Sequence, residues 1–160
     1  MTITQKITPF LWFNENAEEA AEFYVNVFPN SKILSKHYYP KDFPNLGGKI
    51  MTVSFELNSL QFTALNGGPR YSFTEAVSFV VNCDTQEEID HYWDSFLAQG
   101  GKELACGWIK DPFGLAWQIV PSALAKYLSG NDKTRSERVM QALWGMNKLI
   151  IADLEKAYTQ

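Results

Sequence analysis

The chain is poor in histidine and cysteine, with two of each in 160 residues, and it carries no excess of basic residues. The two cysteines, Cys83 and Cys106, define no disulfide framework. The formal charge of -4 leaves no basic stripe for nucleic acid. No apolar run approaches the roughly 18 residues of a membrane span, and the first six residues show no signal pattern. We therefore expect a cytoplasmic protein that binds neither nucleic acid nor membranes.

Aromatic residues, in contrast, are abundant. They make up 14% of the sequence and include five Trp and eleven Phe. Some of these rings must form the core, and their number also suits an apolar pocket lined by rings. A length of 160 residues allows one compact domain with a sizeable core, so we treat residues 1–160 as a single domain.

Two segments of the chain, residues 16–28 and 85–97, resemble each other. Each follows a short apolar run, at 9–13 and 76–81, and each precedes strand-like segments that end in a hairpin. Apolar residues recur at helical spacing in both segments, which predicts two amphipathic helices. Asn16 with Glu19, and Thr85 with Glu88, have the spacing of a capping box at the helix start. A repeat of this kind predicts two copies of one β-α-β-β-β unit.

The strand pattern defines two modules, at about 5–66 and about 75–121. Asn58-Ser59 is a two-residue hairpin signal, and Asp111-Pro112-Phe113-Gly114 is a turn with Pro at its second position. We expect strands at about 7–13, 32–39, 50–57 and 60–65, and then at about 76–82, 102–105, 107–110 and 115–120.

The remainder of the chain, 122–160, is predicted to be helical. Helices are expected at 122–128, about 133–144 and about 147–158, with breaks at Gly130 and Gly145. Apolar stripes on these helices, which include Trp144, must cover either the protein's own sheet or a partner subunit.

Several motifs resemble one known family. Two such modules with Asp-Pro-x-Gly in the last hairpin resemble the vicinal oxygen chelate superfamily of glyoxalases, ring-cleaving dioxygenases and bleomycin-resistance proteins. The segments Ile-Thr-Pro-Phe-Leu-Trp-Phe (7–13), Leu-Asn-Gly-Gly-Pro (65–69) and 106–121 are similar to the PhnB-like branch, whose members often carry the label 3-demethylubiquinone-9 3-methyltransferase. The resemblance implies an α+β fold of two βαβββ modules that form paired half-barrel sheets, with a helical C-terminal extension here. It also implies a homodimer.

In that superfamily a metal ion is held by histidine and carboxylate side chains at fixed strand positions. Projected onto this sequence, those positions carry Gln118, Thr63, Ser78, and Pro9 or Thr8. A divalent ion loses bound water when it enters a protein site, and neutral oxygen ligands alone compensate poorly for the free-energy cost of that loss. We therefore expect no metal and no other cofactor.

Seven residues are candidate contacts for a small aromatic or apolar molecule. For Gln118 and Ser78 the alternative is a pair of satisfied polar groups in a filled barrel, and for Asn66 it is a turn before Gly-Gly. Trp108 and Trp117 could form an aromatic wall, or one of them could pack in the core. The candidates are Phe13, Thr63, Asn66, Ser78, Trp108, Trp117 and Gln118.

Three functions are compatible with these residues. The first is a metal-free small-molecule-binding protein of the bleomycin-resistance type. The second is an enzyme of the same fold, such as a lyase, a dioxygenase or the labelled methyltransferase, with metal-free or atypical-metal chemistry. Its catalytic residues are unknown, and Asp111, His37 and Glu56 are the only plausible acids or bases. The third is a structural role with a filled barrel.

Cys106 could act as a nucleophile only if a nearby cation or helix N-terminus lowered the pKa of its thiol. Lys110 is close to it in the sequence but no histidine is, so we expect an inert thiol.

Overall fold

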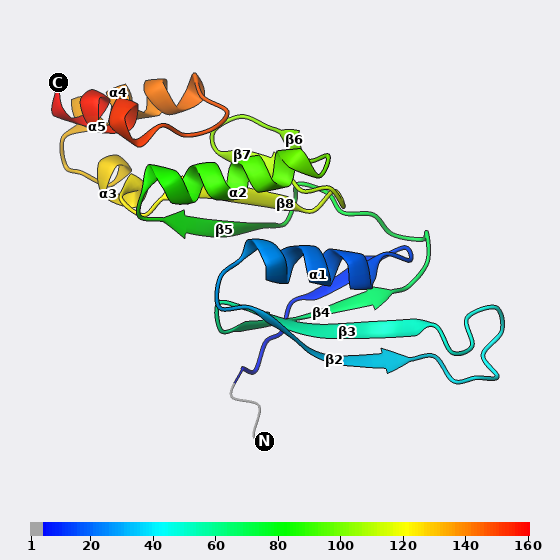
Figure 1. Cartoon of the computed structure of the whole chain (residues 1–160). Helices are drawn as coiled ribbons and strands as arrows, with labels where there is room; N and C mark the ends of the chain where they lie inside the picture. Colours follow the sequence, from blue (N-terminus) through cyan, green and yellow to red (C-terminus); the bar gives the residue numbers. More distant parts are fainter. Residues whose placement is uncertain (1–4) are drawn as a thin grey trace. The chain divides into compact units, whose positions relative to one another are not determined.

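The computed structural model describes residues 5–160, so part of the amino-terminal segment used to argue against a signal sequence lies outside the described residues. The fold is α+β and divides into two compact units, one ending at Phe73 and the other beginning at Thr74 (Figure 1). Each unit contains one four-stranded mixed sheet. The predicted fold class is confirmed, and one expected module lies in each unit.

The first unit follows the predicted β-α-β-β-β order: β1 (Phe10–Phe13), α1 (Ala17–Val27), β2 (Lys32–Tyr38), β3 (Ile50–Leu57) and β4 (Leu60–Asn66). The strands are ordered β1-β4-β3-β2, and β1 runs parallel to β4. Helix α1 covers one face of this sheet with its small residues and Tyr24, whose ring stacks on Phe55 at 5.9 Å. Because strand side chains alternate between faces, every second residue lies on the face that α1 does not cover.

The second unit repeats the order with β5 (Ser78–Cys83), α2 (Gln86–Ala98), β6 (Lys102–Glu103), β7 (Trp108–Lys110) and β8 (Ala116–Pro121). The strands are ordered β5-β8-β7-β6, with β5 parallel to β8. The predicted cap of α2 is present, since Thr85 Oγ1 accepts a hydrogen bond from the Glu88 N–H at 3.2 Å. The Glu88 carboxylate in turn accepts from the Asp84 N–H at 2.5 Å instead of from Thr85.

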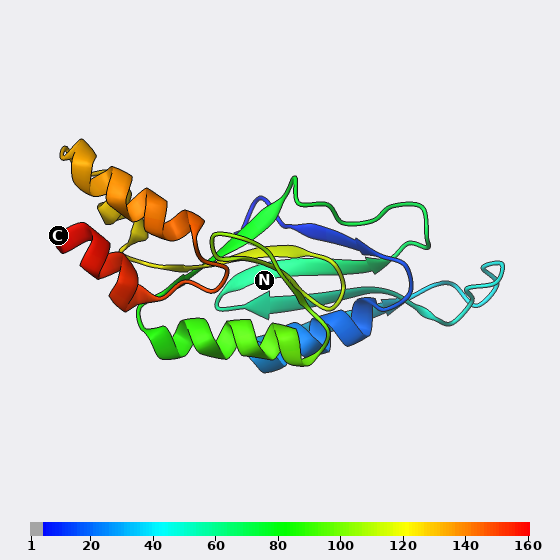
Figure 2. The same cartoon turned by 90° about the horizontal axis from the view of Figure 1, so that it is seen from above.

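The C-terminal extension belongs to the second unit and contains α3 (Leu124–Leu128), α4 (Lys133–Trp144) and α5 (Ile151–Thr159). Helices α4 and α5 pack side by side (Figure 1, Figure 2). Their apolar stripes form a small core with the end of β8, so they cover part of their own unit. Trp144 is an exception to the expected stripe, because 68% of it is exposed. The core contains Val120, Tyr127, Val139, Leu143, Leu149 and Leu154.

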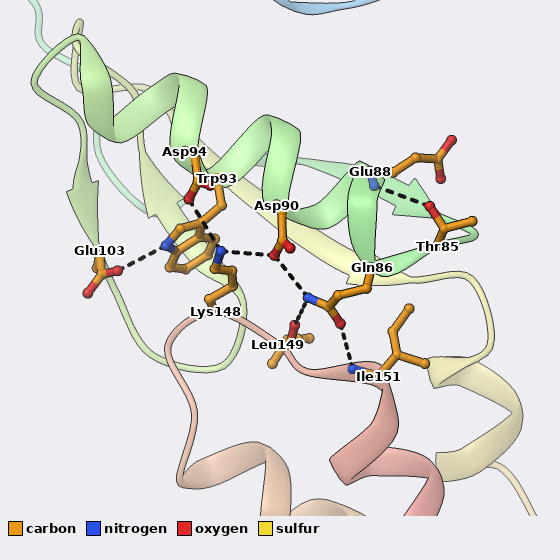
Figure 3. A network of polar contacts seen from close by, with 10 residues as sticks. All are labelled: Thr85, Gln86, Glu88, Asp90, Trp93, Asp94, Glu103, Lys148, Leu149 and Ile151. Carbon is orange, nitrogen blue, oxygen red and sulfur yellow. Dashed lines mark hydrogen bonds and ion pairs between the residues drawn. The ribbon is translucent and has the colours of Figure 1, made fainter.

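The expected helix start at residue 147 is wrong, because α5 begins at Ile151. The N–H groups of Cys106 and Gly107 donate to the Met146 and Asn147 carbonyls, each at 2.8 Å. The Gln86 side chain then donates to the Leu149 carbonyl and accepts from the Ile151 N–H (Figure 3). These contacts hold residues 146–150 in a non-helical conformation before the helix begins.

The remaining strand boundaries agree with the prediction to within a few residues. The largest difference is in β1, which begins at Phe10 and not at 7, because its ladder starts where Phe10 lies opposite Thr63. Within residues 5–160, no helix combines the length and apolarity needed to cross a bilayer.

Candidate functional site

In the second unit, a polar pair and an aromatic ring lie together on the sheet face opposite α2. Gln118 Nε2 donates a hydrogen bond to Ser78 Oγ at 2.9 Å, and Trp108 lies directly across from Gln118 in the β7–β8 ladder. Val80 is opposite Gln118 on β5 and is 51% exposed. Gln118 reaches this face because its neighbours in β8, Trp117 and Ile119, are buried on the other. An amide, a hydroxyl and an indole therefore share one surface.

Trp117 lies on the opposite face of the same sheet, so it does not form a wall with Trp108. Its ring packs against Phe79 at 5.5 Å and against Phe96 of α2 at 5.7 Å. The cause is register: Trp117 pairs with buried Ile109, whereas Trp108 pairs with Gln118. The side chain is only 3% exposed, which makes it a core residue of this unit.

The predicted turn at Asp111 is stabilised by its own carboxylate. Oδ1 accepts hydrogen bonds from the Phe113 and Leu115 N–H groups, at 2.8 and 3.0 Å. Oδ2 accepts from the indole Nε1–H of Trp117 at 2.9 Å, and the residue is 3% exposed. A carboxylate that is buried and engaged in this way fixes the hairpin, which argues against its use as a catalytic base.

In the first unit, Thr63 lies in a row of side chains on the face that α1 does not cover. The ladders place it opposite Phe10 on β1 and Ser54 on β3, and Ser54 lies opposite Ser35 on β2. Phe13 has a different environment. It is 3% exposed, and its ring meets Phe73 edge to face at 5.1 Å.

Asn66, the last residue of β4, connects three segments of the first unit. Its Oδ1 accepts a hydrogen bond from the Ala17 N–H at 2.8 Å, and its Nδ2 donates to the Ile50 carbonyl at 3.1 Å. Its own carbonyl accepts from the Tyr39 hydroxyl at 2.7 Å. The expected cap Asn16 makes no side-chain hydrogen bond to α1. The helix start is therefore satisfied from β4 instead.

Asn66 also lines a groove of about 760 Å³. Its lining residues come from the edge of the unit where β2 and β4 end and α1 and β3 begin, and these ends can be followed in Figure 1. One wall is formed by Glu15 and Glu18 near the start of α1, and another by Tyr38, Tyr39 and the loop that follows them. All of the lining residues belong to the first unit. Of the seven predicted site residues, only Asn66 is among them.

Comparison with known proteins identifies the family. The profile of the 3-demethylubiquinone-9 3-methyltransferase family matches residues 5–120. The structure is similar to that of a putative 3-demethylubiquinone-9 3-methyltransferase, a PhnB protein from Bacillus cereus, with 35% identity over 73% of this chain and 99% of that one and a TM-score of 0.66. This chain belongs to that PhnB-like family, within the vicinal oxygen chelate superfamily. The predicted resemblance is confirmed.

More distant structures share the fold. A protein from Pseudomonas aeruginosa is 23% identical over 74% of this chain and 98% of its own, with a TM-score of 0.60. The fosfomycin resistance protein FosX from Listeria monocytogenes, in complex with Mn(II) and sulfate, is 14% identical over 79% of this chain and 97% of its own, with a TM-score of 0.54. No curated protein matches the chain. The family match ends at residue 120, so α3, α4 and α5 lie outside it.

The residues at the projected metal positions do not fit a metal ion. Across residues 5–160, no three His, Cys, Asp or Glu side chains gather closely enough to coordinate one. Thr63 and Ser78 supply neutral hydroxyls, and the Gln118 amide already donates to Ser78. A divalent ion needs anionic or imidazole ligands to offset its dehydration. The side chains at these positions therefore do not support a reaction that uses a bound metal ion.

The other candidate catalytic groups are dispersed. His37 is exposed near the end of β2. Glu56 on β3 lies 3.9 Å from Lys32 Nζ. Burial raises the pKa of the Cys83 thiol to about 12, which keeps it protonated at neutral pH. Cys106 is half-buried and its backbone N–H is bonded to Met146.

The sequence prediction missed the groove except for Asn66. Two signals near it were visible: the consecutive Tyr38-Tyr39, and a loop rich in Pro and Gly at 40–48. Neither signal indicates that the loop lies near the start of α1, because that placement depends on pairing between distant strands.

Proposed function

We propose that this protein binds a small aromatic or apolar molecule on the sheet face formed by Ser78, Gln118 and Trp108, without a metal ion. The observation that supports this most directly is the hydrogen-bonded Gln118–Ser78 pair beside the Trp108 ring, on the face that α2 does not cover. The indole offers a stacking surface for a flat ligand. The amide and hydroxyl retain further hydrogen-bonding capacity and would orient the ligand.

In the first unit, Thr63 and Phe10 offer a similar combination of a hydroxyl and a ring on the face opposite α1. Three of the candidate residues do not contact the ligand in this proposal but support the structure around it: Asn66, Phe13 and Trp117. Asn66 holds the start of α1, and the two buried rings support the strands from the helix side.

A methyltransferase activity, suggested by the family description, is the second candidate. A nucleotide-derived methyl donor is commonly held by a glycine-rich strand-to-helix turn. The three strand-to-helix junctions within residues 5–160, at 14–16, 84–85 and 122–123, contain no glycine. The geometry therefore favours binding without this chemistry. The charged group on this face is Lys110, which lies opposite Ala116 and is paired with the Glu75 carboxylate.

The test is a thermal-shift screen of the purified protein with quinones and aromatic antibiotics. A ligand at about 100 times its Kd stabilises the native state by about 2.7 kcal/mol, which raises Tm by several degrees. We expect such a shift for the native chain and for Trp144→Ala, and its loss in Trp108→Ala and Gln118→Ala. Trp144 is the matched control because its exposed ring lies far along the chain, on α4.

Two results would contradict the proposal. A shift that persists in both Trp108→Ala and Gln118→Ala would place the ligand elsewhere. Stoichiometric zinc, nickel or iron in elemental analysis of the purified protein would overturn the metal-free part.

We extend the proposal to a cytoplasmic homodimer. The support is the resemblance to a superfamily whose members commonly pair, together with exposed apolar residues such as Val77 at 64% and Val80 at 51%. Light scattering coupled to size-exclusion chromatography should give twice the 18.2 kDa chain mass, and a single chain mass would refute the dimer.

A further inference from the structure

The groove of the first unit has a rigid frame. The side chain and carbonyl of Asn66 join the starts of α1 and β3 to Tyr39. The 40–48 loop is closed by its own backbone hydrogen bonds, including Tyr39 N–H to Lys49 O and Gly48 N–H to Tyr39 O. A side chain at Gly47 would lie 2.1 Å from the Lys41 carbonyl, so the loop requires glycine there. A binding site preformed in this way loses little entropy when it is occupied.

The groove also contains a carboxylate that has no partner among the described residues. Glu18 is paired with Lys36, and Lys36 lies 3.8 Å from Glu22 as well. Glu15, by contrast, makes no hydrogen bond or ion pair with any other part of the chain that the structure describes. Its carboxylate is therefore available to a positively charged group.

Another part of the groove lining is aromatic. Tyr38 is 57% exposed, and the Tyr39 ring is held against Phe43 at 5.0 Å while its hydroxyl is bonded to Asn66. Aromatic faces attract cations through their quadrupole and also pack against flat apolar groups. The volume of about 760 Å³ lies within the range typical of small-molecule pockets.

We propose that this groove is a second ligand site, which binds a small organic cation: an ammonium group attached to a flat apolar body. The ammonium group lies at Glu15, and the apolar body lies against Tyr38 and Tyr39. Lys49 also lines the groove, and it is exposed, as Glu15 is. Its longer side chain can extend into solvent, which leaves the Glu15 carboxylate to the ammonium group. The site is on the edge beside α1 and uses none of the residues of the Ser78–Gln118–Trp108 face, so it is independent of the function proposed above.

The experiment titrates the full chain, labelled with ¹⁵N, with phenethylamine and follows backbone amide shifts. The amine should shift Gly48 and Gly68, which line the groove. Two probes of similar shape separate charge from apolar packing: neutral 2-phenylethanol and anionic 3-phenylpropanoate. We expect the amine to bind at least about threefold more tightly than the alcohol, as one partly exposed charge pair would give. The anion should bind most weakly.

Variants assign the contacts. Glu15→Gln should weaken amine binding about threefold and leave alcohol binding unchanged. Glu19→Gln is the matched control, because it removes the same charge from an exposed position in the first turn of α1 that does not line the groove. Tyr38→Ala should weaken all three probes.

Several outcomes would overturn the proposal. They are absence of amine binding at millimolar concentration, equal affinity for amine and alcohol, equal effects of Glu15→Gln and Glu19→Gln, or loss of binding in Trp108→Ala. The last result would place the cation on the other proposed face. Retention of amine binding in Trp108→Ala supports the groove whether or not that other face binds a ligand.

Discussion

The Asn66 side chain accepts, through Oδ1, a hydrogen bond from the Ala17 N–H at 2.8 Å, so the end of β4 caps the start of α1. A contact across 49 positions of sequence performs the task that is usually given to the residue just before the helix. The same side chain donates to the Ile50 carbonyl.

Asn66→Ala should therefore lower the free energy of unfolding by about 1–2 kcal/mol, since it removes a helix cap and leaves the Ile50 carbonyl without this donor. Urea denaturation followed by circular dichroism measures the change. Asn14→Ala is the matched control: Asn14 is a nearby exposed asparagine that also lines the groove, and it should be nearly neutral. Equal losses in the two variants would contradict the capping role.

Asp111→Ala should destabilise the protein by about 2–4 kcal/mol. It removes the acceptor of two backbone N–H groups and leaves the indole N–H of Trp117 buried without this partner. Asp111→Asn should also destabilise, because an amide nitrogen facing the indole N–H cannot accept its hydrogen bond. Chemical denaturation tests both variants, and Asp153→Ala, at an exposed position of α5, serves as the control. An unchanged midpoint in Asp111→Ala would refute the structural role.

Gln86→Ala should loosen the C-terminal extension, because this side chain bonds both the Leu149 carbonyl and the Ile151 N–H (Figure 3). Hydrogen exchange in 146–160 should accelerate, while exchange in the first unit should not change. Glu87→Ala alters the exposed neighbouring position and should have no such effect. Uniform acceleration over the whole chain would indicate global destabilisation instead.

The ion pairs of Lys148 with Asp90 and Asp94 give this attachment a pH dependence. The hydrogen bond from Lys148, and then that from Gln86, lowers the pKa of Asp90 below 3.8, so its contribution is present above pH 3.8 and is lost as the pH falls further. The pKa of Lys148 is raised above 10.5, chiefly by its hydrogen bond to Asp90, so its contribution is lost only above that pH. The stability difference between the native chain and Lys148→Met should be constant from pH 5 to about 9 and shrink at both extremes. Denaturation at several pH values checks this, and a difference that grows below pH 3.8 would be contrary to it.

The two thiols should differ in reactivity. Cys83 is fully buried with a pKa raised to about 12, mainly by burial, and Cys106 is half-buried. A thiol reagent at pH 8 should therefore modify one cysteine in the native chain and both after unfolding. Cys106→Ser should abolish the native reaction, and native labelling that persists in this variant would contradict the assignment.

Much of the fold could be predicted because its signals are local. The repeated helices, the Asn58-Ser59 hairpin and the Asp111 turn depend on residues that are close in sequence, and the structure contains all three. The predicted helix start at 147 was wrong because long-range hydrogen bonds with Gln86, Cys106 and Gly107 hold that segment in a non-helical conformation.

The α+β class and the repeated module could be predicted from residue types and short spacings, and the family resemblance supplied the projected metal positions that carry no carboxylate or imidazole. The placement of Trp108 and Trp117 on opposite faces could not be predicted in this way, since it depends on the register between β7 and β8. The same holds for Asn66, which caps α1 and lines a groove. Hydrogen bonds between residues far apart in the chain leave no local pattern, and so they become visible only when the strands are paired.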